Sequence, residues 1–392
     1  MTRLAIVPGA VASDGLRALV LTREARSHPT VTLAAEGAPA NAVRAVEVRP
    51  PPAIAPIITA LRTRVYRVHA PGLAAGARHT LSAAADGVAQ RALLRTLPDA
   101  LPDEGFTLAI ASCYYRGYPL HAQIAAALRT ARLEQPAAAL LLLGDNLYID
   151  EPAPSGRAFD VVQRYVDHLF DPGYGSVRAL LPTFTTWDDH EFWNDFPEPQ
   201  FHLPFTFDAQ RSSEHRAAAL ACLELFQGGI NPDRVQPRGR SYGFPLLPLR
   251  FFVADMRTQR SRVSARAPAM LQPDDLDALE AFLLNTDGPC VVCLGQPLWM
   301  PARSRVLGIT FDHNPPAFPA QYARIWNALR AARYDVLLLA GDVHYSRLLR
   351  IAPGTTAANR VVWECVSSPL CHLPSPITRA QGQSAIADPA RA

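Results

Sequence analysis

Side chains that can bind metal ions or transfer protons occur in four short clusters, each placed directly after an apolar run. The clusters are Ser112-Cys113, Gly144-Asp145-Asn146-Leu147-Tyr148, Trp187-Asp188-Asp189-His190-Glu191 followed by Asn194-Asp195, and Gly341-Asp342-Val343-His344. Carboxylates held close together repel and raise one another's pKa, so this many acidic groups at one place require a bound cation. Carboxylate and amide oxygens suit hard ions, imidazole suits iron, zinc or manganese, and thiolate with phenolate favours ferric iron. The pattern predicts a site for two or more metal ions.

Strands alternating with helices are predicted from residue 106 onward, and these elements must position the four clusters. Apolar runs predict strands at residues 106–111, 137–143, 183–187, 251–254, 291–294, 336–340 and 361–363. Apolar periodicity predicts helices at residues 119–134, 158–170, 208–226, 272–284 and 321–333. Because ligands of α/β sheets bind at the carboxyl ends of strands, we expect the clusters to meet at one rim of a layered α/β domain.

The N-terminal residues have a different pattern. Short apolar runs at 18–21, 31–33 and 64–68 are separated by Gly, Pro and Ala, without a sustained helical period. This pattern favours a small antiparallel β-sandwich of the fibronectin-III kind, and the polar, proline-bearing stretch after it favours a linker. We therefore predict an α/β protein with an N-terminal β-sandwich domain at 1–96, a linker at 97–105 and the α/β domain at 106–392.

All 38 basic residues of the 392-residue chain are arginine. The absence of lysine excludes a Walker-type phosphate loop, a Schiff-base enzyme and a lysine general base. A net charge of +3 without basic runs argues against sequence-specific nucleic-acid binding, and no apolar stretch is long enough to span a bilayer. The sequence has neither signal-peptide order nor an Arg-Arg pair before an apolar run, which favours a cytoplasmic protein, and its six scattered cysteines suit a reducing compartment.

At these clusters the sequence resembles the PhoD-like branch of the metallophosphoesterases, over residues 106–370. The strings that carry the resemblance are Ala111-Ser112-Cys113, Gly144-Asp145-Asn146-Leu147-Tyr148, Trp187-Asp188-Asp189-His190-Glu191 with Asn194-Asp195, Asp255-Met256-Arg257-Thr258-Gln259-Arg260, and Gly341-Asp342-Val343-His344-Tyr345-Ser346. The wider superfamily opens with Asp-x-His and closes with Gly-His-x-His; Cys113 and His344 stand in those places here, as in the PhoD-like branch. The resemblance implies a layered metallophosphoesterase-type α/β sandwich preceded by the family's usual β domain.

The resemblance also implies a set of metal ligands. Asp145 resembles the carboxylate that bridges the metals. The ferric-ion ligands would be Cys113, Tyr148 and His344. The oxygen ligands of the calcium site or sites would be Asp189, Asn194 and Asp342, with Asp188 as a further choice. The implied cofactors are Fe³⁺ and Ca²⁺, with zinc, manganese and magnesium as alternatives.

Four side chains near these ligands are predicted to act on the substrate. His190 would protonate the leaving alkoxide. Arg257 would grip the phosphate through a forked contact, because a guanidinium matches phosphate oxygens in pairs. Arg260 and Trp193 would contribute further substrate contacts.

Two or more metal ions about 3.5–4 Å apart, bridged by one carboxylate, are the usual apparatus for hydrolysing a phosphoester with a metal-bound hydroxide. We therefore expect a hydrolase of small-molecule phosphoesters, acting on monoesters, diesters or both, with the oligomeric state left open. The alternatives are a non-catalytic metal-binding or scaffold protein, and a serine-type esterase, for which Gly144-Asp145-Asn146 lacks the serine. Cys290 and Cys293 lie in an apolar strand with opposite side-chain directions, which predicts buried thiols. His372 has no partner at ligand spacing along the sequence.

Overall fold

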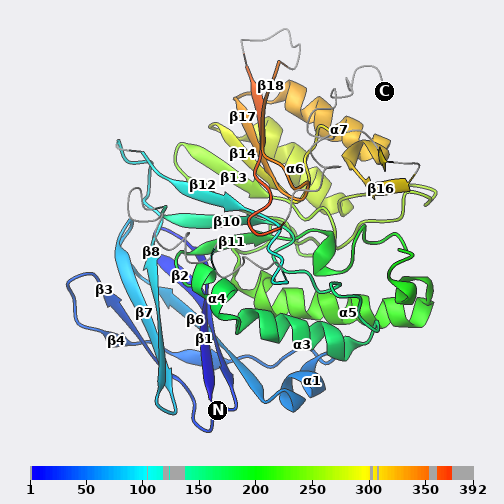
Figure 1. The fold of residues 1–392 in the computed structure, drawn as a ribbon. Coiled ribbons are helices and arrows are strands. Elements are labelled where there is room, and N and C mark those ends of the chain that lie inside the picture. Colours follow the sequence, from blue (N-terminus) through cyan, green and yellow to red (C-terminus); the bar gives the residue numbers. More distant parts are fainter. Residues whose placement is uncertain are drawn as a thin grey trace.

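The computed structural model describes residues 2–103, 105–117, 123, 137–300, 303–306, 309–352 and 360–372. The helix predicted at 119–134 falls almost entirely outside these residues. Figure 1 shows an N-terminal β unit at the lower left and an α/β unit in which helices flank two sheets. None of the helices in the described ranges combines the length and the apolar character needed to cross a membrane.

The N-terminal unit consists of two antiparallel four-stranded sheets. The first contains, in sheet order, β1 (Arg3–Val11), β2 (Gly15–Arg23), β6 (Thr63–Pro71) and β5 (Ala45–Glu47). The second contains β4 (Asn41–Ala42), β3 (Thr30–Ala35), β7 (Arg78–Ala85) and β8 (Val88–Arg95), and a short helix, α1 (Ala55–Ala60), precedes β6. Burial alternates along β7, so one face of the second sheet packs inward. The predicted N-terminal antiparallel β fold is confirmed.

The α/β unit contains two further sheets. The three-stranded sheet is parallel, in the order β11 (Thr183–Thr186), β10 (Ala139–Leu143) and β9 (Leu108–Ala111). The six-stranded sheet has the order β12 (Tyr242–Leu246), β13 (Leu249–Val253), β14 (Cys290–Leu294), β17 (Val336–Ala340), β19 (Val362–Val366) and β18 (Arg347–Ile351). Its four inner strands run parallel and its two edge strands antiparallel. A separate hairpin joins β15 (Arg303–Val306) to β16 (Ile309–His313).

The two sheets share one core because their apolar strands are buried on both faces. Leu141 and Leu143 of β10 belong to the same cluster as Val291 of β14. Leu140 and Leu142, which point to the other face, pack with Val177 of α4. This arrangement is the layered α/β sandwich that was predicted.

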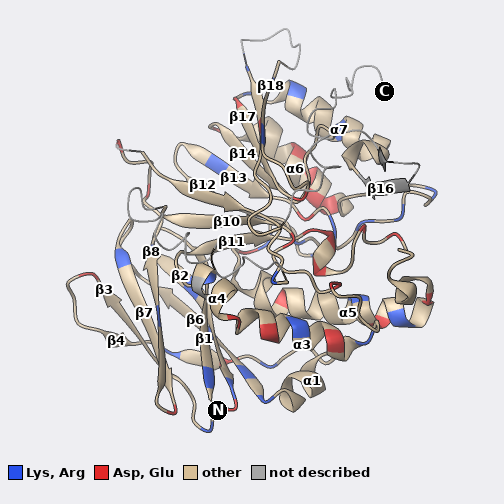
Figure 2. Cartoon of the chain, viewed as in Figure 1, with Lys and Arg blue, Asp and Glu red and all other residues tan. Residues whose placement is uncertain are grey.

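Helices cover the outer sides of the sheets. They are α3 (Ala158–Leu169), α4 (Pro172–Arg178) and α5 (Ala209–Phe226) on one side, and α6 (Pro273–Asn285) and α7 (Pro319–Ala331), which pack on the six-stranded sheet. Single turns of 3-10 helix are η1 (Asp189–Glu191), η2 (Pro204–Phe207), η3 (Gly228–Ile230) and η4 (Pro315–Ala317). Asp171 and Asp208 cap α4 and α5 by accepting backbone N–H groups of the first turn. Figure 2 shows acidic and basic residues interspersed along α3 and α5, as on solvated helix faces.

The predicted strands and helices that fall in the described residues of the α/β unit are present, and none of their ends is displaced by more than three residues. Strand β12 was not predicted; it contains Gly243 and Pro245 and lies at a sheet edge, where proline is tolerated. Cys290 and Cys293 are buried in different clusters, as expected for opposite faces of β14. The domain boundaries around 97–105 stay a prediction.

Candidate metal centre

The four predicted clusters meet because each follows the carboxyl end of a parallel strand: β9, β10, β11 or β17. Two glycines allow these strand ends to approach closely. Gly144 has φ +92°, and a Cβ there would come within 2.7 Å of the Asp188 Cβ. A Cβ at Gly341 would come within 2.4 Å of the Leu143 carbonyl oxygen. A larger residue at either position would therefore push the acidic loops apart.

One group of ligand atoms surrounds the Cys113 thiol. The ligand atoms of Cys113, Asp145 and His344 lie within 4.8 Å of one another. The Cys113 Sγ is 3.5 Å from Asp145 Oδ2 and 3.1 Å from Ser368 Oγ. The Tyr148 hydroxyl lies 3.4 Å from the same Asp145 Oδ2 and 3.1 Å from His344 Nε2. The three predicted ferric-ion ligands and the predicted bridging carboxylate are thus brought together.

A second group of ligand atoms lies on the other side of Asp145. Ligand atoms of Asp145, Asp189 and His190 lie within 4.8 Å of one another, and so do those of Asp188, Asp189 and Asp342. Asp145 therefore belongs to both the thiol group and the carboxylate group. A carboxylate shared in this way is placed as a residue that bridges two cations would be.

The backbone is strained at the candidate ligands. Cys113, Asp145, Asp342 and His344 all have positive φ values, of 59°, 51°, 67° and 53°. The left-handed region is sparsely used by residues other than glycine and costs about 1–3 kcal/mol each. Such strain persists where the surrounding structure enforces it, and it concentrates at functional sites.

The protonation states of these groups also point to a cation. Burial, and then the Asp342 charge, raises the pKa of the Cys113 thiol to about 12. Burial and the charges of Cys113 and Asp145 hold the pKa of Tyr148 well above its usual range. Burial, and then the nearby His372 and His190, lowers the pKa of His344 to about 3, so its imidazole is neutral and can act as a ligand. Without a cation this site keeps protons on its thiol and phenol.

One buried carboxylate oxygen supports the fit to a cation directly. Asp189 Oδ2 accepts the Asp195 N–H at 2.5 Å, whereas the buried Oδ1 has no hydrogen-bond partner. The Arg257 Nη2 lies 3.9 Å from Oδ1, beyond hydrogen-bond distance. An orphaned oxygen beside two other carboxylates matches a position that a metal ion would fill. The residues present therefore fit the predicted metal group.

His190 is held by a carboxylate that the sequence did not single out. Its Nδ1 lies 2.8 and 3.0 Å from the two oxygens of Asp150, which is 1% exposed. Asp150 also accepts the Asn194 N–H at 2.7 Å. Burial lowers the pKa of His190, but Asp150 and Asp189 outweigh it and raise that pKa to about 10. His190 is thus oriented and kept protonated in this arrangement.

The phosphate grip predicted for Arg257 is not what the geometry shows. Its guanidinium is fully buried, with Nε 2.6 Å and Nη2 2.9 Å from the two oxygens of Asp188. The two N–H groups that could have bound a phosphate therefore bind Asp188, and Nη1 donates to the Phe196 carbonyl. Arg260 is likewise buried and donates to the Met256 carbonyl and to Gln296. We reassign both arginines from the substrate to the support of the acidic loops.

Two further predicted residues have a different place in the structure. Trp193 is 3% exposed, donates to the Glu198 carbonyl and packs in the core against Phe196 and Phe205, so it lines no open substrate pocket. Asn194 lies beside the cluster and its backbone N–H binds Asp150. Its predicted role as a ligand stays a prediction.

Several residues at the site were given no role from the sequence. They are Asp150, Glu191, Gln296, Ser368 and His372. Glu191 accepts the N–H groups of Asp145, Asn146 and Asp188 and so joins two ligand loops. Gln296 and Ser368 each follow a predicted strand, which was an available signal. His372 was set aside for lack of a partner, yet its ring centroid lies 4.2 Å from that of His344.

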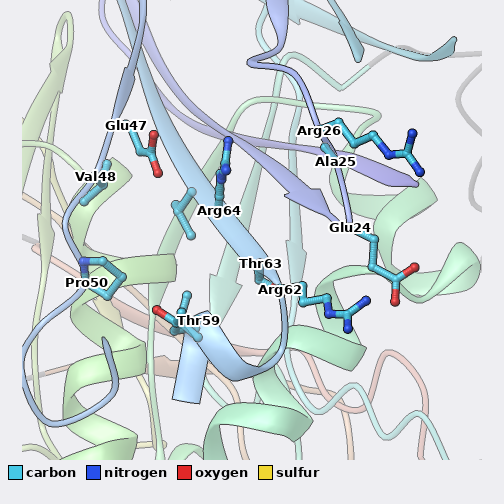
Figure 3. A pocket seen from close by; sticks show the side chains of 12 residues that line it. Glu24, Ala25, Arg26, Glu47, Val48, Pro50, Thr59, Arg62, Thr63 and Arg64 are labelled. Carbon is cyan, nitrogen blue, oxygen red and sulfur yellow. The ribbon is translucent and has the colours of Figure 1, made fainter. Parts of the chain in front are cut away.

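A hollow of about 510 Å³ on the β unit lacks these features. Its lining includes Arg26, Arg62 and Arg64, and Figure 3 shows that their guanidinium groups do not converge on one point. Glu24 and Glu47 lie among them. We therefore place the candidate site at the strand ends of the α/β unit.

Comparisons with known proteins bear on the fold. No protein-family model and no curated protein matches the chain. The solved structure described as "Structure of PhoD" matches 94% of this chain and 77% of its own, with a TM-score of 0.68 and 17% identity. The purple acid phosphatase PPD1 from yellow lupin (Lupinus luteus) seeds matches 93% of this chain and 63% of its own, with a TM-score of 0.58 and 12% identity. The chain therefore has the fold that PhoD and the lupin purple acid phosphatase share.

Proposed function

We propose that the protein hydrolyses small-molecule phosphoesters in a metal-dependent reaction. The observation that carries this proposal is the position of Asp145, which belongs both to the thiol group and to the carboxylate group of ligand atoms. A bridging carboxylate between two cation positions is the arrangement that phosphoester hydrolysis uses. The shared fold with PhoD and a purple acid phosphatase supports the same class of reaction.

The proposed ligands divide between a soft and a hard position. Cys113, Tyr148 and His344 would hold the more polarising ion, for which we propose Fe³⁺. Asp189 and Asp342 would hold a harder ion, for which we propose Ca²⁺, with zinc, manganese or magnesium as alternatives. Bound metal ions would supply Lewis acidity toward the phosphoryl oxygens and a water of lowered pKa.

The protein's own residues would orient the reaction and move its proton. His190 is held through Nδ1 by Asp150, so Nε2 is the nitrogen that would face the leaving oxygen. A protonated imidazole can donate to a leaving alkoxide, which is a strong base and leaves slowly without a proton. Arg257 is buried and holds both oxygens of Asp188, so in this proposal it supports the acidic loops and does not bind the substrate. The donor to the leaving group is therefore His190.

The alternatives are less well supported by the same geometry. Among the described residues no serine is paired with a histidine ring at the site, as a serine-type esterase would need. Ser368 Oγ contacts the Cys113 thiol and accepts the His344 N–H, while the His344 ring contacts Tyr148. A non-catalytic metal-binding role would not require the Asp150–His190 pair.

The test is a panel of aryl and alkyl phosphomonoesters and phosphodiesters, assayed with and without a chelator, with metal content measured on the same sample. We expect turnover that the chelator abolishes and added metal restores. Turnover that is indifferent to the chelator would support an esterase of another kind. Bound metal without turnover on any ester would support the non-catalytic alternative.

A further inference from the structure

The loop after β13 was predicted to grip the substrate, and its two arginines are instead buried beside the acidic ligands. Arg257 and Arg260 are 0% and 3% exposed, and the Arg260 N–H donates to the Arg257 carbonyl, which closes a turn. Asp255 holds this turn by accepting the Trp187 indole N–H and the Arg257 backbone N–H. The turn is thus a fixed base from which both guanidinium groups extend.

The two arginines reach two different carboxylates in different ways. Arg257 meets both oxygens of Asp188 directly. Arg260 Nη2 donates to Gln296 Oε1 at 2.7 Å, and Gln296 Nε2 donates to Asp342 Oδ2 at 3.0 Å. Because a guanidinium only donates hydrogen bonds, Arg260 fixes which end of the Gln296 amide carries the oxygen. The N–H₂ end must then face Asp342.

Gln296 occupies a defined place in the sheet. Leu294 of β14 pairs with Ala340 of β17, and the Gly341 N–H donates to the Gly295 carbonyl, so residues 296 and 342 follow at matching positions. Gln296 is fully buried. The Arg260 guanidinium lies over the Phe318 ring, 5.2 Å from its centroid. This contact helps to fix the guanidinium that binds Gln296.

The chemical difference between the two connections is the basis of the inference. A bidentate guanidinium places a full positive charge on the Asp188 carboxylate and uses both of its oxygens. A neutral amide restrains the Asp342 carboxylate but leaves its negative charge for a cation. Asp342 is thereby oriented as a ligand, whereas Asp188 is neutralised.

We propose that Gln296 and Arg260 form a relay that positions Asp342 and sets the affinity of the carboxylate side of the site for a divalent cation. The inference rests on the proposed function, since Asp342 is a metal ligand only there. Gln296 is a positioning residue in this scheme and does not touch the substrate. Arg260 acts on Asp342 through Gln296.

The test measures Mn²⁺ binding to the metal-depleted full-length protein by electron paramagnetic resonance of the free ion. The variants are Gln296→Leu, Arg260→Met and the double variant. Loss of a hydrogen-bond partner of a ligand weakens metal binding about 10–100-fold, which we expect for Gln296→Leu. Arg260→Met should weaken it less, and the double variant should match Gln296→Leu within about two-fold, because residues in one relay are not additive.

A matched control separates positioning from folding. Gln321 is another buried amide, but it accepts the Met270 and Leu271 backbone N–H groups in place of holding a carboxylate. Gln321→Leu should lower the urea midpoint of the metal-free protein without changing the Mn²⁺ affinity. Arg260→Met tests the relay a second time, because it removes the hydrogen bond to Gln296 Oε1 and leaves Gln296 itself in place.

The outcomes distinguish the two proposals. Wild-type protein that binds Mn²⁺ while Gln296→Leu binds it equally well would overturn the relay alone. Losses from Gln296→Leu and Arg260→Met that multiply in the double variant would also overturn it, because the two residues would then act independently. Wild-type protein that takes up no Mn²⁺, Fe³⁺ or Ca²⁺ would overturn the proposed function together with the relay.

Discussion

Replacing Asp150 with asparagine tests the proton-donating role of His190. Asp150 is buried and both of its oxygens contact His190 Nδ1, at 2.8 and 3.0 Å. Asparagine has nearly the same size and can still accept the Asn194 N–H, which Asp150 accepts at 2.7 Å. The substitution therefore removes the negative charge beside the imidazole with little change in packing.

The magnitude follows from the pKa of His190. A rise from the ordinary 6.5 to about 10 corresponds to about 5 kcal/mol in favour of the imidazolium. Burial opposes this rise, and Asp189, a proposed metal ligand, supplies part of it. We assign about half, ~2–3 kcal/mol, to Asp150, so Asp150→Asn should lower the pKa of His190 by about two units and reduce kcat/KM ~30–150-fold at pH values above the wild-type pKa, where the fraction of imidazolium sets the rate.

The assay compares alkyl and 4-nitrophenyl esters of the type that the protein hydrolyses. An alkoxide needs a proton to leave, whereas 4-nitrophenolate is a weak base and leaves without one. Asp150→Asn should therefore lower kcat/KM for the alkyl ester at alkaline pH by this amount and hardly change it for the nitrophenyl ester. The alkaline limb of the alkyl-ester pH profile should also move to lower pH, because a less stabilised imidazolium loses its proton earlier.

A buried carboxylate away from the site supplies the control. Asp275 is fully buried and accepts the Arg240 and Ser241 N–H groups, so Asp275→Asn makes the same chemical change without touching His190. It should leave the ratio of the two substrates unchanged. Equal losses on both esters in Asp150→Asn, or an unshifted alkaline limb, would refute the proton-donor assignment.

Three other outcomes are expected. Asp145→Asn should abolish turnover and lower the metal content measured by elemental analysis, while circular dichroism shows an intact fold; retained activity would exclude a bridging role. Tyr148→Phe should remove a visible phenolate-to-iron absorption band if Fe³⁺ occupies the thiol side, and a colourless active wild-type protein would exclude iron there. Metal uptake at pH 7 should release protons, measurable by calorimetry in buffers of different ionisation enthalpy, because Cys113 with a pKa of about 12 must lose its proton to bind, whereas the neutral His344 releases none.

Much of the fold and the convergence of the cluster could be predicted from the sequence because both depend on local patterns. The five apolar residues of β17 mark a buried strand, and Gly341-Asp342 directly after it marks a strand end. The rule that parallel strands present their carboxyl ends at one edge then brings Asp342 to Asp145. In the structure both residues lie within 4.8 Å of Asp189 through their ligand atoms, although the sequence identity to PhoD is only 17%.

The partners of these residues could not be predicted, because they depend on contacts between distant parts of the chain. Cys113 and Ser368 are 255 positions apart, and Arg257 and Asp188 are 69 apart. The sequence shows that residue 257 is an arginine. It does not show whether the guanidinium is already paired with a carboxylate inside the protein. Its assignment to the phosphate failed for that reason. His372 was missed likewise, since its contact with His344 crosses 28 positions without regular spacing.

The candidate ligands are held in strained backbone conformations and in a crowded group of like charges. Cys113, Asp145, Asp342 and His344 have left-handed backbones, at a cost of several kcal/mol in total if each costs ~1 kcal/mol or more. In addition, burial and neighbouring charges raise the pKa of Asp145 well above its usual range, so the metal-free site is unfavourable electrostatically as well. Packing alone would favour glycine at the strained positions and apolar residues in place of the buried acids. A bound cation would offset the electrostatic part by stabilising the carboxylates and the thiolate, which couples the stability of this loop cluster to metal binding. Metal binding would thus account for both the positions of these four residues and their side-chain chemistry.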